Sequence, residues 1–186
     1  MLLDTSGTYA VELKKAQNII NFLLGTLQPG ETLAVGRIDT GSFSEKDIIA
    51  KVTFDDRPSV ANNQKRAFQK KIADFVTDTK GSRYTDISGG ILQAVEYLNE
   101  SKANHKYILI FSDLKEELAQ GHVRNVPFQL SGFSLVALNV TKLREDIRDP
   151  QQYMTRLEQW RSKTENGGGQ WWVINDLERL DAIFPN

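Results

Sequence analysis

Hydrophobic residues recur along the chain in two patterns: near-continuous apolar runs, and apolar positions spaced three and four residues apart. The runs predict buried strands at 1–4, 32–38, 48–54, 106–112, 133–140 and 170–174. The spaced positions predict amphipathic helices at about 13–27, 62–79, 87–99 and 150–166, and a last helix capped by Asn175 or Asp176. Strands that alternate with helices in this way are typical of an α/β fold.

This alternation predicts a doubly wound, mostly parallel six-stranded sheet with helices on both faces, a Rossmann-like arrangement. One strand should be an antiparallel edge, because only the polar segment 39–47 separates strand 48–54 from strand 32–38. In the common strand order 3-2-1-4-5-6, the first and fourth strands are neighbours. Trp171 and Trp172 point to opposite faces of the last strand, so we expect one in the core and the other under a helix.

The chain shows no internal repeat and no linker, so its 186 residues predict a single domain spanning 1–186. Met1-Leu2-Leu3 is too short to cross a sheet at ~3.3 Å per residue, so we expect the domain to lack the start of its first strand. The compartment depends on what precedes Met1. A signal segment there would favour export or the cell envelope, and its absence would favour the cytoplasm.

Composition narrows the classes of function. Lys and Arg number 23 against 24 for Asp and Glu, a formal net charge of −1, so we expect no nucleic-acid partner held by bulk positive charge. The absence of cysteine excludes disulfides, iron–sulfur clusters, thiolate zinc sites and a cysteine nucleophile. The apolar runs fall far short of the ~18 residues of a spanning helix, so no membrane span is expected.

Oxygen-bearing side chains gather where two buried strands end and before one helix. Asp4-Thr5-Ser6-Gly7-Thr8 follows the first strand, Asp113 follows the fourth, and Thr85 precedes helix 87–99. Ligands of open α/β sheets bind outside the carboxyl ends of the strands, so we expect Asp4 and Asp113 to face one crevice with the hydroxyls. Two carboxylates and three hydroxyls form an all-oxygen site, which suits a hard cation such as Mg²⁺.

The same residues bear a family resemblance. The stretch Asp4-Thr5-Ser6-Gly7-Thr8, Thr85 and Asp113 together resemble the metal-ion-dependent adhesion site (MIDAS) of von Willebrand factor type A (VWA) domains. That family has Asp-x-Ser-x-Ser after its first strand, then a Thr and an Asp in later loops. Thr8 replaces the second Ser but keeps the hydroxyl, and Leu114 stands where many members have Gly. The order of strands and helices also matches, so the resemblance covers essentially the whole chain.

The resemblance implies a non-enzymatic, metal-dependent protein-binding domain with a VWA fold. Ser6 and Thr8 would coordinate the metal directly, and Asp4, Thr85 and Asp113 would do so directly or through water. Mg²⁺ is the expected ion, with Mn²⁺ or Ca²⁺ as alternatives. The partner would be a protein that completes the coordination with an exposed Asp or Glu.

Other interpretations of these residues stay open. Asp4 and its hydroxyl neighbours would also serve as an ordinary helix N-cap, and Asp113 would equally cap the segment 114–119. The domain would then be a metal-free scaffold. A haloacid-dehalogenase-type phosphatase also places an Asp after its first strand with Mg²⁺. It needs a second Asp two residues later as general acid, and that position here is Ser6.

Overall fold

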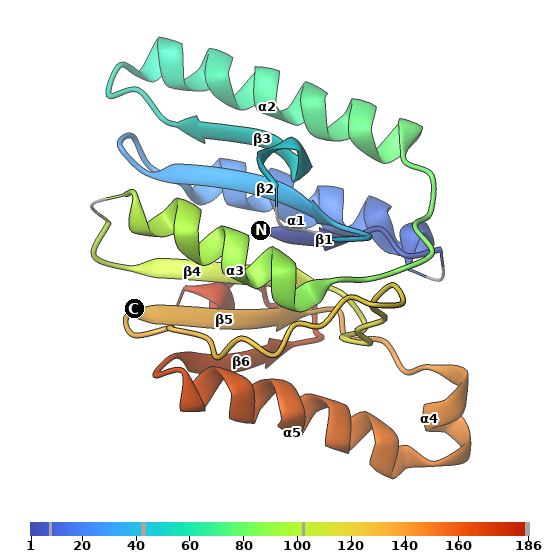
Figure 1. Cartoon of the computed structure of the whole chain (residues 1–186). Helices are drawn as coiled ribbons and strands as arrows, with labels where there is room; N and C mark the ends of the chain where they lie inside the picture. Colours follow the sequence, from blue (N-terminus) through green and yellow to red (C-terminus); the bar gives the residue numbers. More distant parts are fainter. Residues whose placement is uncertain (8, 42–43, 102, 185–186) are drawn as a thin grey trace.

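A computed structural model describes residues 1–7, 9–41, 44–101 and 103–184 (Figure 1). Its strands form one sheet in the order β3-β2-β1-β4-β5-β6. The strands are β1 (Leu2–Asp4), β2 (Thr32–Ile38), β3 (Ile48–Thr53), β4 (Lys106–Phe111), β5 (Phe133–Leu138) and β6 (Gln170–Ile174). All neighbours pair in parallel except β2 and β3, which are antiparallel. The predicted fold class is therefore confirmed, including the antiparallel edge.

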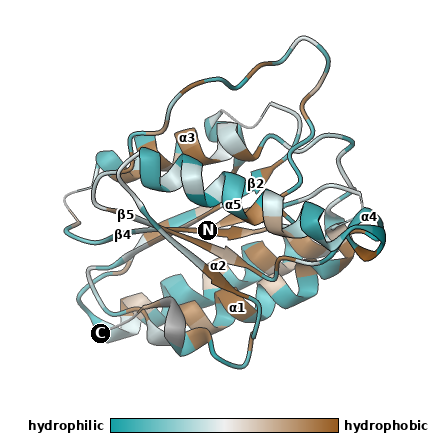
Figure 2. Ribbon diagram, turned by 90° about the horizontal axis from the view of Figure 1, so that it is seen from below, coloured by the Kyte–Doolittle hydropathy of each residue, from teal (hydrophilic) through white to brown (hydrophobic). Residues whose placement is uncertain are grey.

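Helices cover both faces of the sheet. They are α1 (Leu13–Thr26), α2 (Pro58–Asp78), α3 (Ile87–Asn99), α4 (Arg144–Arg148) and α5 (Pro150–Asn166), with short 3₁₀ helices at Ala10–Glu12, Glu45–Asp47 and Leu180–Ile183. Side chains of α1 and α2 pack in one core cluster, and those of α3 and α5 in another. Neighbouring residues Leu2 and Leu3 enter opposite clusters, because successive side chains of a strand point to opposite faces. Figure 2 shows hydrophobic strands between helices whose outer faces are largely hydrophilic.

Three local expectations need correction. The predicted helix at 62–79 begins at Pro58 instead, because proline suits the first position of a helix. The last helix is wrong: Asp176 accepts a hydrogen bond from the Glu178 backbone N–H in a turn, and only the 3₁₀ helix Leu180–Ile183 follows. Trp171 packs against the core, but Trp172 is 50% exposed on the edge strand rather than covered by a helix.

The connection from β4 to β5 contains no regular helix, although parallel strands are usually joined by one. In its place, the irregular segment 112–132 inserts the buried side chains of Phe128 and Leu130 into the core between α3 and α5. The Leu130 backbone N–H donates to the Gly167 carbonyl at 2.7 Å, which ties the segment to the end of α5. This segment begins with Ser112 and Asp113, so its anchoring matters for the candidate site.

Candidate functional site

The sheet brings the ends of β1 and β4 side by side. Leu3 pairs with Phe111, so the next residues, Asp4 and Ser112, lie at the same level. The Ser112 hydroxyl donates to Asp4 Oδ2 at 2.6 Å, and the Ser6 backbone N–H donates to Asp4 Oδ1 at 2.8 Å. The predicted proximity of the first and fourth strand ends is thus confirmed. Asp4 is fully buried, with both carboxylate oxygens already in hydrogen bonds.

Asp113 is the second buried carboxylate at this edge, 3% exposed. Its Oδ1 accepts a hydrogen bond from the Lys115 backbone N–H at 2.8 Å, whereas no hydrogen bond from a described residue reaches Oδ2. Burial, with the neighbouring charge of Asp4, raises the pKa of Asp113 to about 6. Burial also raises the pKa of Asp4. Neither carboxylate forms a salt bridge with any side chain in the described ranges.

Backbone pairing links the loop of Thr85 to the loops of both aspartates. Ser82 N–H donates to the Thr5 carbonyl at 2.6 Å, and Gly7 N–H donates to the Ser82 carbonyl at 2.8 Å. Thr85, itself buried, exchanges two backbone hydrogen bonds with Glu117 of 2.8 and 3.0 Å. The structure therefore brings the loops that carry Asp4, Ser6, Thr85 and Asp113 together. The fifth predicted residue, Thr8, lies outside the described residues.

Side chains of α5 hold the loop that follows Asp113. Arg156 Nε donates to the Asp113 carbonyl at 2.9 Å, and Trp160 Nε1 donates to the Leu114 carbonyl at 2.9 Å, one helical turn later. The Arg156 guanidinium also makes hydrogen bonds of 3.1 and 2.6 Å to the buried carboxylate of Asp146. We name Arg156, Trp160 and Asp146 the α5 clamp.

Leu114 occupies a backbone conformation that favours glycine. Its φ is 64°, in the left-handed region that L side chains adopt at a cost. The leucine side chain is buried in the core beside α5, and this apolar burial offsets the backbone cost. The position where the family resemblance has glycine therefore keeps a glycine-like backbone here.

Tyr9 anchors the segment that follows Asp4. Its hydroxyl donates to the Asn139 carbonyl at 2.5 Å and accepts a hydrogen bond from Asn139 Nδ2 at 2.9 Å. The same amide donates to Glu12 Oε2 at 3.0 Å. The Tyr9 ring meets Phe111 edge-on, with centroids 5.2 Å apart. The segment after Asp4 is thus tied to the ends of both β4 and β5.

The helix-cap interpretation fits neither predicted aspartate. Asp4 accepts from Ser6 within a turn, and α1 begins nine residues later at Leu13 without a side-chain cap. Asp113 likewise accepts within a turn, and no helix occupies 114–119. Asp86, next to Thr85, does cap a helix: its side chain accepts a hydrogen bond from Gly89 N–H at 2.8 Å at the start of α3.

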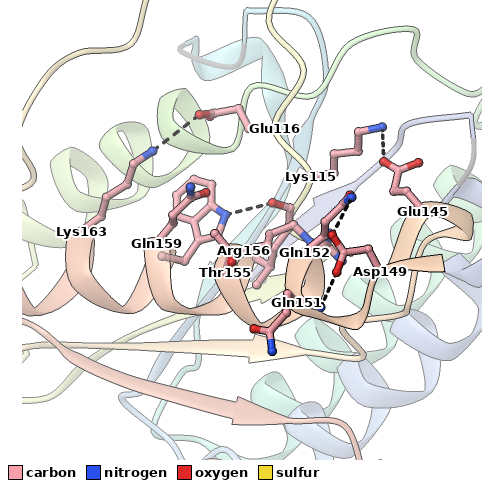
Figure 3. A pocket seen from close by; sticks show the side chains of 12 residues that line it. Lys115, Glu116, Glu145, Asp149, Gln151, Gln152, Thr155, Arg156, Gln159 and Lys163 are labelled. Carbon is pink, nitrogen blue, oxygen red and sulfur yellow. Dashed lines mark hydrogen bonds and ion pairs between the residues drawn. The ribbon is translucent and has the colours of Figure 1, made fainter. Parts of the chain in front are cut away.

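A groove of about 510 Å³ lies beside the Asp113 loop, between Lys115 and the outer face of α5 (Figure 3). Lys115 pairs with Glu145 at 2.9 Å and Lys163 with Glu116 at 3.8 Å, so the charged side chains that line the groove are largely paired with opposite charges.

No three His, Cys, Asp or Glu side chains in the described part of the chain converge as a metal site. The cluster at the strand ends has only two carboxylates, and hydroxyls would have to supply its further ligands. No described helix is long and apolar enough to cross a membrane.

No protein-family model and no curated protein matches this sequence. Solved structures do resemble the fold. A von Willebrand factor type A structure from Catenulispora acidiphila matches 98% of this chain with a TM-score of 0.55 and 14% identity. BatB, a conserved hypothetical protein from Bacteroides thetaiotaomicron, matches 98% with a TM-score of 0.54 and 14% identity. An aerotolerance-related membrane protein from Bacteroides fragilis, with multiple mutations to serines, also matches 98%, with a TM-score of 0.51 and 14% identity.

These similarities establish a VWA-like fold for the chain. It spans 39% of the Catenulispora chain, 92% of the BatB chain and 94% of the Bacteroides fragilis chain. At 14% identity the likeness concerns the fold alone.

Proposed function

We propose that this chain is a protein-binding domain that uses a divalent cation, Mg²⁺ in the first place, at the carboxyl ends of β1 and β4. Asp4, Ser6, Thr8, Thr85 and Asp113 would hold the ion directly or through water. An exposed Asp or Glu of a partner protein would complete its coordination.

The observation that carries this proposal is a pair of buried carboxylates to which no side chain of the described residues forms a salt bridge. Asp4 and Asp113 lie at adjoining strand ends, and burial raises the pKa of each. Two buried like charges disfavour the ionised state, and a divalent cation offsets both costs. Oδ2 of Asp113, which accepts no hydrogen bond from a described residue, is a suitable ligand atom. The donor set consists of carboxylate and hydroxyl oxygens, which Mg²⁺ and Mn²⁺ prefer.

The same donor set favours binding of an acidic partner. Two carboxylates balance the charge of a divalent ion, and together with two or three neutral hydroxyls they supply four or five oxygen ligands. A further carboxylate, supplied by the partner, would complete the octahedral coordination that Mg²⁺ prefers. Ca²⁺ fits less well, because it takes six to eight oxygen ligands.

The phosphatase alternative has one observation in its favour and one against it. Asp113, with a pKa raised to about 6, is the kind of group that acts as a general acid. Asp4, the required nucleophile, is fully buried, and Ser112 and Ser6 occupy its two oxygens. We therefore expect no hydrolysis of an aryl phosphate in the presence of Mg²⁺, and steady turnover would favour the enzyme.

Thermal unfolding with and without Mg²⁺ tests the proposal. An ion that binds only the folded chain at 100 times its Kd should stabilise it by about 2.7 kcal/mol. Asp4→Asn keeps a hydrogen-bonding side chain beside Ser112 but removes the charge, so this variant should lose the Mg²⁺ effect. Asp74→Asn, at an exposed position on α2, is the matched control and should retain it. Equal shifts in both variants would contradict the site, and no shift in the parent chain would favour a metal-free scaffold.

A further inference from the structure

β6 is an edge strand whose outer side pairs with no other strand of the described residues (Figure 1). Trp172 is 50% exposed and Val173 is 37% exposed, and they lie on opposite faces because successive side chains of a strand alternate. The segment after β6 turns back across the sheet, where the Phe184 ring meets Tyr107 of β4 edge-on with centroids 5.0 Å apart. An open apolar edge of this kind is a template for pairing with another chain.

The opposite edge strand, β3, has features that discourage such pairing. Lys51 is exposed within β3, and a bulge interrupts the pairing of β3 with β2 between Val35 and Gly36. Lysine side chains and bulges on edge strands disfavour the addition of a further strand. In β6, residues 170–174 contain no charged side chain and no proline, and they pair with β5 in unbroken register. One open edge favours a closed pair of molecules, since a filament needs two.

The hydrogen bonds to β5 determine which backbone groups of β6 face outward. The Ile174 carbonyl accepts from Asn139 N–H at 3.1 Å, so the backbone groups of Ile174 face β5. The side to which these groups point alternates along a strand, so those of Trp172 also face β5, whereas those of Trp171 and Val173 face outward. The outward groups therefore lie symmetrically about Trp172, the central residue of β6.

This symmetry makes β6 complementary to a reversed copy of itself. In an antiparallel pair centred on Trp172, Trp171 of one copy lies opposite Val173 of the other, and each such pair exchanges two main-chain hydrogen bonds. Cross-strand pairs of an aromatic and a β-branched residue stabilise a sheet by about 0.2–1 kcal/mol each. The two copies of Trp172 meet at the two-fold axis as a non-hydrogen-bonded pair. No like charges meet, because the strand has none.

We propose that two copies of this chain associate through β6, antiparallel about a two-fold axis at Trp172, to form one continuous sheet. The interaction needs no metal and uses none of the candidate site residues. A single strand pair is a small interface, so we expect a dissociation constant in the micromolar range. The two-fold axis reverses the strand direction, so the carboxyl ends of β1 and β4 in the two copies point in opposite directions. The dimer would then present two partner sites in opposite directions, and this consequence alone rests on the proposed function.

Sedimentation velocity at increasing concentrations of the chain, with a chelator present, tests the proposal. The parent chain should change from monomer at ~1 µM to dimer at ~200 µM. Trp172→Lys places two like charges opposite each other at the axis and should weaken association at least ~10-fold. Ile147→Lys changes an apolar side chain on α4 that is 75% exposed, and this matched control should associate like the parent chain.

Circular dichroism establishes that both variants are folded before their association is compared. A parent chain that stays monomeric at ~200 µM overturns the proposal. Equal association of Trp172→Lys and Ile147→Lys also overturns it, because a dimer would then form through another surface.

Disulfide trapping tests the register of the pair, because the chain contains no cysteine of its own. The Cα atoms of a non-hydrogen-bonded antiparallel pair lie ~4.5 Å apart, a separation that a disulfide spans. Trp172→Cys should therefore form a disulfide between two copies under mild oxidation. Gln170→Cys is the matched control, because its two copies would lie ~13 Å apart at ~3.3 Å per residue. Trapping of Gln170→Cys equal to or above that of Trp172→Cys contradicts a two-fold axis at Trp172.

Discussion

Replacing Arg156 by methionine should destabilise the domain by about 3–5 kcal/mol, the usual cost of leaving a buried charge without its partner. The Asp146 side chain is 0% exposed, and Arg156, 12% exposed, supplies its ion pair through two hydrogen bonds. Methionine keeps the apolar stem of the arginine, so the loss reports on the charge and its hydrogen bonds. The hydrogen bond to the Asp113 carbonyl disappears as well.

Urea unfolding followed by circular dichroism measures this loss. Arg161→Met on the same helix is the matched control, because Arg161 is exposed and water screens its pair with Glu165, so its loss should have little effect on stability. Adding Asp146→Asn to Arg156→Met removes the unpaired charge and should restore part of the stability. A loss below about 1 kcal/mol for Arg156→Met, or one equal to that of Arg161→Met, would refute the role given to the α5 clamp.

Three further predictions concern the loop that follows β4. Asp113 has a folded-state pKa of about 6 against an ordinary 3.8, so folding favours its protonated form. In the metal-free chain, this contribution to the free energy of unfolding is fully present below pH 4 and is lost as the pH rises to about 6. The loss is at most about 3 kcal/mol, and Asp113→Asn should abolish this pH dependence in unfolding titrations. Trp160→Phe removes the donor to the Leu114 carbonyl and shortens a buried ring, so it should lower the free energy of unfolding by about 1–3 kcal/mol. Leu114→Gly relieves about 1–2 kcal/mol of backbone cost but removes a buried side chain worth about 2–5 kcal/mol. The variant should therefore have a lower melting temperature than the parent chain, and a higher melting temperature would contradict the burial argument.

The strands β4 and β5 were predictable from sequence because they are buried on both faces of the sheet. The residues of β4 alternate between the two core clusters, so nearly every position is apolar and the run is recognisable. β2, α3 and β6 have the predicted bounds. The last helix was mispredicted because three apolar positions after Asp176 suit a 3₁₀ turn as well as an α-helix. The exposure of Trp172 follows from its place on an edge strand, and the pattern of one strand does not reveal what covers it.

For the candidate site, the sequence predicted which strand ends meet but not what holds them. Asp4 and Asp113 follow recognisable strands, and the order of strands makes them neighbours. Arg156 and Tyr9 were missed because they donate hydrogen bonds to backbone carbonyls 43 and 130 residues away. Every residue has a backbone carbonyl, so the sequence does not reveal which one accepts. The only local signal is the four-residue spacing of Arg156 and Trp160 on one face of α5.

Calorimetric titration of the chain with Mg²⁺ tests the central proposal most directly. We expect one ion per chain in the parent protein, and Mn²⁺ should compete for the same site. In Asp113→Asn, binding should be lost or at least ~100-fold weaker, while circular dichroism shows the fold retained. No saturable Mg²⁺ binding to the parent chain, or equal affinity in Asp113→Asn, would contradict a metal site at the ends of β1 and β4.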